Sequence, residues 1–301
     1  MASSSLAALL VGSGAPAAFA QCAISPGTNQ SSVSNSAAIN CINIQGIAVT
    51  GNVINTGPPN TGIITPTGFA PPTRTGITIN SASVGGAIVN AGQITAPTSG
   101  DGIVVTNNAT VSGGISNSGQ ITATTYADGI VVTNNAAVFG GISNSGTISA
   151  GHGQFVNGIL IGGNAVTSHT TVTIATFAGG ISNSGMISMG SGNAILVGGD
   201  DANANIAAFS GGISNSGMIS TPGSGIFVGG DEPSAVADTI TISTFAGGIS
   251  NSGTIAAGKG IFVGGFASRG TITVSTFAGG IVNSGTISAG NAGSNGIAVR
   301  G

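Results

Sequence analysis

The 301-residue chain contains 55 Gly and no Trp, and its 4 basic and 7 acidic residues give a formal net charge of −3 at pH 7. Charged residues make up 4% of the chain, far below the roughly 25% of ordinary globular domains. Its four basic residues, Arg74, Lys259, Arg269 and Arg300, are scattered, whereas phosphate binding needs a clustered basic face. We therefore expect no nucleic acid partner and no attraction to an anionic membrane surface.

Residues 1–20 are small and mostly apolar, and they end in Ala18-Phe19-Ala20. This ending fits the small-x-small rule of signal peptidase and predicts a signal peptide cleaved before Gln21. A basic n-region is missing, which a start codon assigned too late explains; an ordinary buried N-terminal strand is the alternative. After residue 20 no apolar run approaches the roughly 18 residues of a membrane-spanning helix.

Segment 21–45 contains the only two cysteines, Cys22 and Cys41. An even, minimal cysteine count in an exported chain favours a disulfide, and two unpaired thiols remain the alternative. A metal site is disfavoured, because neither cysteine has a second Cys or a His at ligand spacing. We expect this segment to form an N-terminal cap and to be tied down by the disulfide.

Residues 46–301 consist of tandem repeats of one Gly/Ser/Asn-rich unit. GGISNSG or a near copy begins at Gly51, Gly86, Gly113, Gly140, Gly179, Gly211, Gly247 and Gly279. A second element, G-I-x-V, falls between the copies and predicts a column of Ile47, Ile77, Ile103, Ile130, Ile159, Ile195, Ile226, Ile261 and Ile297. Two more Ile columns begin at Val53 and Ile94. Because a spacing of two places side chains on one face of a strand, we expect the columns inside and the alternate residues in solvent.

Short strands between Gly corners predict an all-β fold, a right-handed parallel β-helix or β-solenoid of about eight coils with three short strands per coil. Helices do not fit, because Gly and β-branched residues are poor helix formers. No coil could be stable alone, since a few buried Ile or Val cannot offset the backbone entropy of about 30 residues. Stability must therefore come from contacts between neighbouring coils.

Two columns are predicted to form ladders along the solenoid. The first is an Asn ladder at a corner, where left-handed backbone is tolerated: Asn55, Asn90, Asn117, Asn144, Asn183, Asn215, Asn251 and Asn283. The second column begins as Val84, Val111 and Val138 and continues as an aromatic stack of Phe177, Phe209, Phe245 and Phe277. We interpret the Phe stack as core packing rather than as a ligand platform.

Candidate chemistry is sparse. Insertions after G-I-x-V hold His169, Asp200, Asp201, Asp231, Glu232 and Asp238. We expect solvated loops there rather than a weak Ca²⁺ site, because the calcium nonapeptide G-G-x-G-x-D is incomplete. Asp101 and Asp128 occupy equivalent positions in adjacent repeats, but we expect no Arg, Lys or His in their column, so we predict no catalytic residue, no cofactor, no metal and no enzyme.

Three T-x-T elements, at Thr171, Thr239 and Thr271, leave ice binding open as an alternative, although Thr suits any exposed strand face. Self-assembly through open solenoid ends is a further alternative.

The signal-like start, the early Cys pair and the GGISNSGTISA and GIxV units resemble the passenger repeats of bacterial autotransporters, the type V secreted proteins. The resemblance covers almost the whole chain. It implies a passenger β-helix that a C-terminal β-barrel carries across the outer membrane and displays at the cell surface, often for adhesion to another surface. The chain lacks segments typical of such a barrel, so we expect a passenger fragment whose only link to the outer membrane is a barrel outside this chain.

Overall fold

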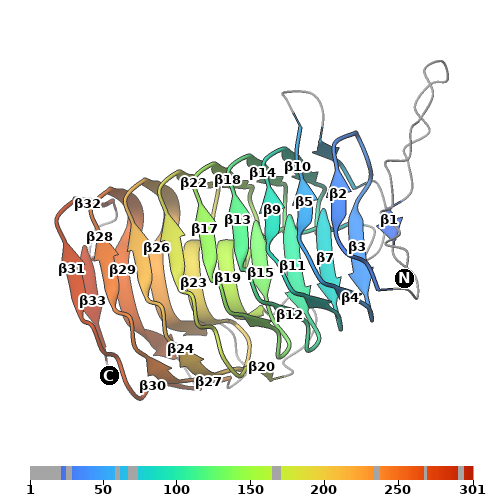
Figure 1. The fold of residues 1–301 in the computed structure, drawn as a ribbon. Coiled ribbons are helices and arrows are strands. Elements are labelled where there is room, and N and C mark those ends of the chain that lie inside the picture. Colours follow the sequence, from blue (N-terminus) through green and yellow to red (C-terminus); the bar gives the residue numbers. More distant parts are fainter. Residues whose placement is uncertain are drawn as a thin grey trace.

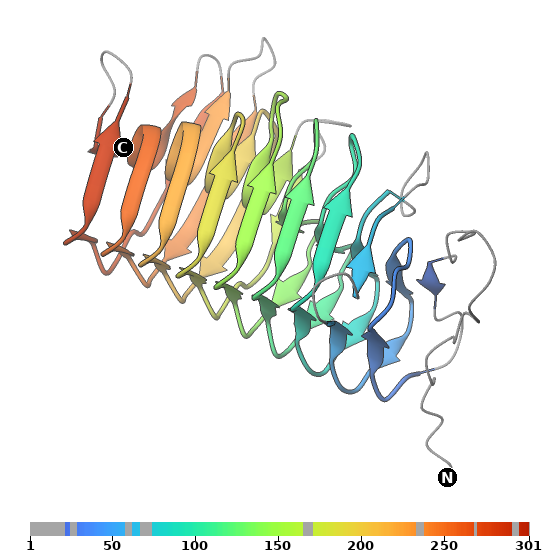
Figure 2. The same ribbon diagram turned by 90° about the horizontal axis from the view of Figure 1, so that it is seen from above.

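The structure, a computed structural model, describes residues 22–24, 29–57, 62–66, 74–164, 171–232, 238–267, 270–290 and 295–300. Within these residues the regular elements are all strands, and every strand pairing is parallel. The chain winds into a parallel β-solenoid in which each coil stacks on the one before it (Figures 1 and 2). No helix long and apolar enough to cross a membrane occurs in the described part of the chain. The predicted signal peptide lies outside it.

A middle coil shows how the chain turns. It runs through β11 (Ile103–Thr106), β12 (Thr110–Val111), β13 (Ile115–Asn117) and β14 (Gln120–Ala123), and then enters β15 (Ile130–Val132) one coil further on. The coil therefore has four strand segments, one more than predicted. The extra corner between β11 and β12 is an Asn107-Asn108 turn, and both residues have positive φ, a backbone region that Asn tolerates better than most residues.

Strands from equivalent positions in successive coils form four sheets. The nine-stranded sheet consists of β2 (Val33–Asn35), β5 (Val53–Asn55), β9 (Ile88–Asn90), β13, β17 (Ile142–Asn144), β21 (Ile181–Asn183), β25 (Ile213–Asn215), β28 (Ile249–Asn251) and β31 (Ile281–Asn283). One four-stranded sheet consists of β4 (Ala48–Val49), β8 (Ser83–Val84), β12 and β16 (Ala137–Val138). The other consists of β20 (Val172–Ile174), β24 (Ala204–Phe209), β27 (Thr239–Phe245) and β30 (Thr271–Val274).

The sixteen-stranded sheet has two rows of strands that merge in the later coils. Its first row contains β6 (Ile63–Ile64), β10 (Gln93–Ala96), β14, β18 (Thr147–Ala150), β22 (Met186–Met189) and β32 (Thr286–Ala289). Its second row contains β1 (Ala23–Ile24), β3 (Ile42–Gln45), β7 (Ile77–Asn80), β11, β15, β19 (Asn157–Asn164), β23 (Asn193–Asp200) and β33 (Ile297–Val299). The long strands β26 (Met218–Glu232) and β29 (Thr254–Ala267) pair with both rows.

The nine-stranded sheet has one strand more than the eight predicted copies of the repeat. Its additional strand, β2, lies in segment 21–45 and pairs with β5 in register, Val33 opposite Val53 and Asn35 opposite Asn55. The surrounding residues lack the Gly-Gly pair of the later repeats, so the repeat motif does not mark this coil in the sequence. Regular coil pairing therefore begins inside the segment that the sequence assigns to a cap.

One member of the G-I-x-V column was predicted wrongly. The residue opposite Ile77 is Ile42, not Ile47. Gly46 adopts a positive φ of 64°, so the chain turns there, and the next strand, β4, pairs Val49 with Val84 in a four-stranded sheet. Gly46-Ile47 resembles the motif but forms a corner.

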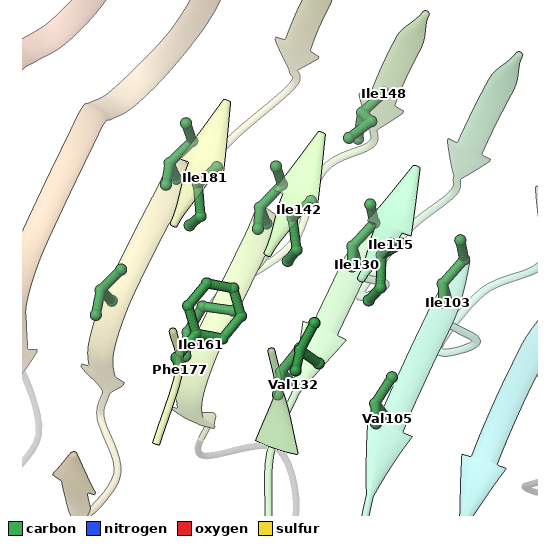
Figure 3. Close-up of a cluster of buried hydrophobic side chains, with 14 of the residues drawn as sticks. Ile103, Val105, Ile115, Ile130, Val132, Ile142, Ile148, Ile161, Phe177 and Ile181 are labelled. Atoms are coloured by element: carbon green, nitrogen blue, oxygen red, sulfur yellow. The ribbon is translucent and has the colours of Figure 1, made fainter. Parts of the chain in front are cut away.

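The core is made of the predicted columns, which align from coil to coil (Figure 3). Ile115 pairs with Ile142 and Ile142 with Ile181, each with at most 2% of its surface exposed. At Gly212 the corner before this column requires glycine, because φ is 69° and a Cβ would lie 2.5 Å from the carbonyl oxygen of Gly247 in the next coil. The first two repeats have Asn52 and Ala87 at the equivalent position. The Gly pairs of the repeat thus let successive corners stack at backbone contact distance.

A second apolar cluster lies on the outer side of the G-I-x-V strands, where solvent was predicted. It contains Val131, Leu160, Leu196, Phe227 and Phe262, all nearly fully buried. After Gly162 the chain folds back over this face. The Asn164 side-chain amide donates to the Phe155 carbonyl oxygen at 2.6 Å, whereas residues nine apart in a straight strand would lie about 30 Å from each other. The x position of G-I-x-V therefore packs under the returning chain.

Candidate functional site

The most extensive polar feature is an asparagine ladder in the interior. Each side-chain amide nitrogen donates to the side-chain oxygen of the next coil, at 2.8 Å from Asn35 to Asn55 and from Asn55 to Asn90, and at 2.7 Å for every later step to Asn283. The predicted ladder residues Asn117, Asn144, Asn183, Asn215, Asn251 and Asn283 all take part.

The ladder asparagines lie at the inner ends of strands rather than in left-handed corners. In β13 the burial pattern places Asn117 on the same inner face as Ile115. Positive φ belongs instead to asparagines of another turn, among them Asn107 and Asn134. Because buried amides need partners, the ladder fixes the register of the coils, and it offers no binding surface.

The predicted Phe column also forms a stack inside the solenoid. Ring centroids lie 5.0 Å apart for Phe177 and Phe209, 4.7 Å for Phe209 and Phe245, and 5.2 Å for Phe245 and Phe277, with interplanar angles of at most 15°. The first three rings have no exposed surface, so the stack is part of the core. It continues the valine column, since Val138 bridges to Phe177.

Cys22 and Cys41 form a disulfide, with their Cα atoms 4.4 Å apart. Cys22 precedes β1 and Cys41 precedes β3, the two strands that pair at the start of the sixteen-stranded sheet. Disulfides persist in oxidising compartments. This bond therefore indicates an extracytoplasmic location.

Asp101 and Asp128 are neighbours, as their equivalent positions predict. The Asp128 backbone N–H donates to the Asp101 carboxylate at 2.9 Å, and the backbone N–H of Asn157 donates to the Asp128 carboxylate. Burial raises the pKa of Asp101 to about 6. Burial also raises the pKa of Asp128, and the nearby Asp101 charge adds to the effect.

Side-chain amides of β19 contact Asp128 and Asp200. Asn164 donates to the second Asp128 oxygen at 3.1 Å, and Asn157 donates to Asp200 at 3.3 Å. Asp200 ends β23 and is only 7% exposed, contrary to the prediction of a solvated loop. Asp201 and Asp238 are buried as well, and Asp231 and Glu232 belong to β26. His169 lies outside the described residues, so its prediction is untested.

A basic residue does stand in the aspartate column, contrary to expectation. Lys259 is opposite Ser224, whose backbone N–H donates to the Asn193 side chain one coil earlier, and Asn193 is opposite Asn157. This path places Lys259 four coils from Asp128, about 19 Å away at 4.8 Å per coil. Lys259 lies instead over the Phe262 ring, 5.9 Å from its centroid. The column therefore brings no cation to the two carboxylates.

Metal-ligating side chains do not gather anywhere in the described part of the chain, where no group of three His, Cys, Asp or Glu could hold an ion. The T-x-T elements align only in part. Thr241 is opposite Thr273, but Asn205 separates Thr241 from Thr173 in the stack. The flat, regular threonine array that ice binding requires is thus interrupted in its second coil.

No known protein family matches the chain, and neither curated proteins nor solved structures gave a match. The resemblance to autotransporter passengers thus stays a prediction from the repeats.

Proposed function

We propose that the protein is an exported, non-enzymatic β-solenoid that acts at the bacterial cell surface as a rigid spacer or as an adhesive contact surface, like the passengers that its repeats resemble. One observation carries the proposal: the asparagine ladder runs without a break from Asn35 to Asn283. A stack in which every coil is hydrogen-bonded to the next through its interior is stiff along its axis and presents the same small polar residues repeatedly on its surface.

The alternatives have weaker support. An enzyme acting on polysaccharides needs an acid and a base around a substrate, whereas both oxygens of Asp128 already accept hydrogen bonds, one from the Asn157 backbone N–H and one from the Asn164 side-chain amide. Ice binding needs the threonine array that Asn205 interrupts. Because the basic residues are scattered, we propose no nucleic acid partner. The partner that we propose is an unidentified surface or another copy of the protein.

Deleting the gene in the bacterium that makes the protein tests the proposal. We expect fewer cells to be retained on a surface under flow, and we expect the unaltered gene to restore retention. Purified oxidised chain added to wild-type cells should compete for the same surface. If the deletion strain were retained as well as the wild type on glass, on mucin and on other cells, an adhesive or spacer role would be contradicted.

A further inference from the structure

Two large aromatic residues stand in left-handed backbone at one corner of the solenoid, between the two rows of the sixteen-stranded sheet. Tyr126, in the turn from β14 to β15, has a φ of 55°, and Phe155, in the turn from β18 to β19, has a φ of 58°. Their places are equivalent, because Tyr126 lies two residues before Asp128 and Phe155 two residues before Asn157. For a bulky side chain this backbone region is an outlier that costs energy.

Other coils make the same corner without an aromatic residue. Ser99, two residues before Asp101, has a φ of 60° one coil earlier. Gly192, just before Asn193, has a φ of 70° one coil later, and glycine adopts such backbone at no steric cost. The fold therefore needs the left-handed turn, but it does not need an aromatic side chain there.

Neighbouring coils hold both aromatic residues in place. The Tyr126 N–H donates to the His152 carbonyl at 3.2 Å, and the Phe155 carbonyl accepts from the Asn164 side-chain amide at 2.6 Å. A Cβ on Gly153 would lie 2.8 Å from Cδ1 of Tyr126, so the ring rests on the backbone of the next coil. Strained residues persist only where their surroundings fix them, and they concentrate at functional sites.

The two aromatic side chains reach solvent among polar groups. Tyr126 is 51% exposed and Phe155 is partly exposed. The side chains of Ser99, His152 and Gln154 are exposed at the same corner. We call these five residues the aromatic corner.

This mixture of groups suits a sugar. One face of a hexose ring consists of apolar C–H groups and is about as large as an aromatic ring, whereas the hydroxyls around the hexose need hydrogen-bond partners. A tyrosine offers both an apolar ring and a polar tip, and the flanking hydroxyl, imidazole and amide add further partners. Two rings are too few for a stable protein interface, which buries about 800 Å² on each partner.

The charges near the aromatic corner favour an uncharged sugar. Two carboxylates, those of Asp101 and Asp128, follow Ser99 and Tyr126 by two residues. Arg74 lies against Gly100 one coil earlier, which places it two coils from Tyr126. A sugar with a carboxylate or sulfate group would therefore be repelled beside Tyr126.

We propose that the aromatic corner binds uncharged hexose units of a glycan. The proposal rests on the adhesive function proposed above and gives that function a ligand class. Tyr126 and Phe155 stack against sugar rings from adjacent coils, while Ser99, His152 and Gln154 bind the hydroxyls.

A glycan array tests the proposal. It carries uncharged oligosaccharides of glucose, galactose, mannose and N-acetylglucosamine beside sialylated and sulfated glycans. We expect the chain to bind at least one uncharged oligosaccharide and none of the acidic ones. Tyr126→Ala should weaken that binding by about tenfold or more, as expected for a central aromatic contact, and Tyr126→Phe should retain most of it.

Tyrosine fluorescence gives a second readout in solution. Because the chain has one Tyr and no Trp, its tyrosine emission comes from Tyr126 alone. Titration with an oligosaccharide that the array identifies should change this emission to saturation. An unchanged emission during binding would place the sugar elsewhere and overturn the proposal.

A matched control separates this corner from any exposed ring. Phe139 is 47% exposed at a different corner, between β16 and β17, so Phe139→Ala should bind the array as the wild type does. Equal binding by Tyr126→Ala, with an unchanged melting temperature, would overturn the proposal. A wild-type chain that binds no uncharged glycan would also overturn it, and if the deletion strain were still retained poorly, the adhesive function would stand without this site.

Discussion

At the scale of single residues, the ladder asparagines have the largest expected effect. Each ladder asparagine from Asn55 to Asn251 has an amide that donates forward and an oxygen that accepts from the coil behind, at a site without solvent. Removing one member leaves two buried groups unpaired, and each costs about 1–3 kcal/mol. An inner ladder position should therefore be far more sensitive to substitution than the surface serines beside it.

We predict that Asn215→Ala lowers the free energy of unfolding by several times as much as Asn283→Ala. The first change strands the Asn183 amide and the Asn251 oxygen inside the core, whereas water can replace the exposed Asn283. Urea titration followed by circular dichroism measures both. Equal losses would mean that the ladder contributes little beyond side-chain volume.

The raised pKa of Asp101 predicts that stability depends on pH. Because the folded-state pKa of Asp101 is raised to about 6, the folded state binds more protons than the unfolded state between pH 4 and 6. The stability from this group is present below pH 4 and is lost as the pH rises through 6. Asp101→Asn should therefore raise the melting temperature at pH 7 and have little effect on it at pH 4. At about 1.4 kcal/mol per pKa unit, the gain in the free energy of unfolding at pH 7 is up to roughly 3 kcal/mol. A loss at both pH values would show that folding needs the charged form.

Several of these residues were predictable from the sequence because repetition exposes them. The asparagine and phenylalanine columns recur in register, and two cysteines allow only one pairing. The environment of Asp101 and Asp128 was not predictable, since it depends on a chain reversal after Gly162 that brings Asn164 back to Asp128. The position of Lys259 in this column was not evident from the repeats, because the other repeats have Thr, Asp, Asn or Ser there.

At the scale of elements, the stacked rings of the Phe column differ in the number of neighbouring rings and in burial. Phe209 lies between two rings and is fully buried, whereas Phe277 contacts one ring and is partly buried. We predict that Phe209→Leu costs more than twice as much stability as Phe277→Leu, because each lost ring contact adds about 0.5–1.5 kcal/mol to the burial that is lost. Thermal unfolding of both variants checks this. A smaller loss for Phe209 would contradict a continuous stack.

Strand pairing followed the predicted columns wherever Gly pairs mark the corners. It departed from them where another residue makes the corner: the Asn107-Asn108 turn adds a fourth strand segment, and Gly46 starts a corner that resembles the motif. The outer cluster could have been recognised from the apolar series Val131, Leu160, Leu196, Phe227 and Phe262 at one position of G-I-x-V, since solvent-facing positions do not become progressively larger and more apolar.

At the scale of the whole molecule, a solenoid is stabilised coil by coil, so damage should stay local. Reducing the Cys22–Cys41 disulfide removes about 3 kcal/mol in the chain-entropy account. At a protein concentration too low for association, we predict that hydrogen exchange accelerates in β2, β3 and β5 and remains unchanged in β25 and β28. Uniform acceleration along the chain would show that the coils unfold as one unit.

The central claim is that this rigid stack acts outside the cell. Labelling intact cells of the organism that makes the protein with an antibody against the folded chain tests it most directly, together with mass spectrometry of the two cysteines. The account predicts labelling without permeabilisation, loss of the label after protease treatment of whole cells, and a Cys22–Cys41 disulfide in the recovered protein. Labelling only after permeabilisation, with both cysteines reduced, would contradict it.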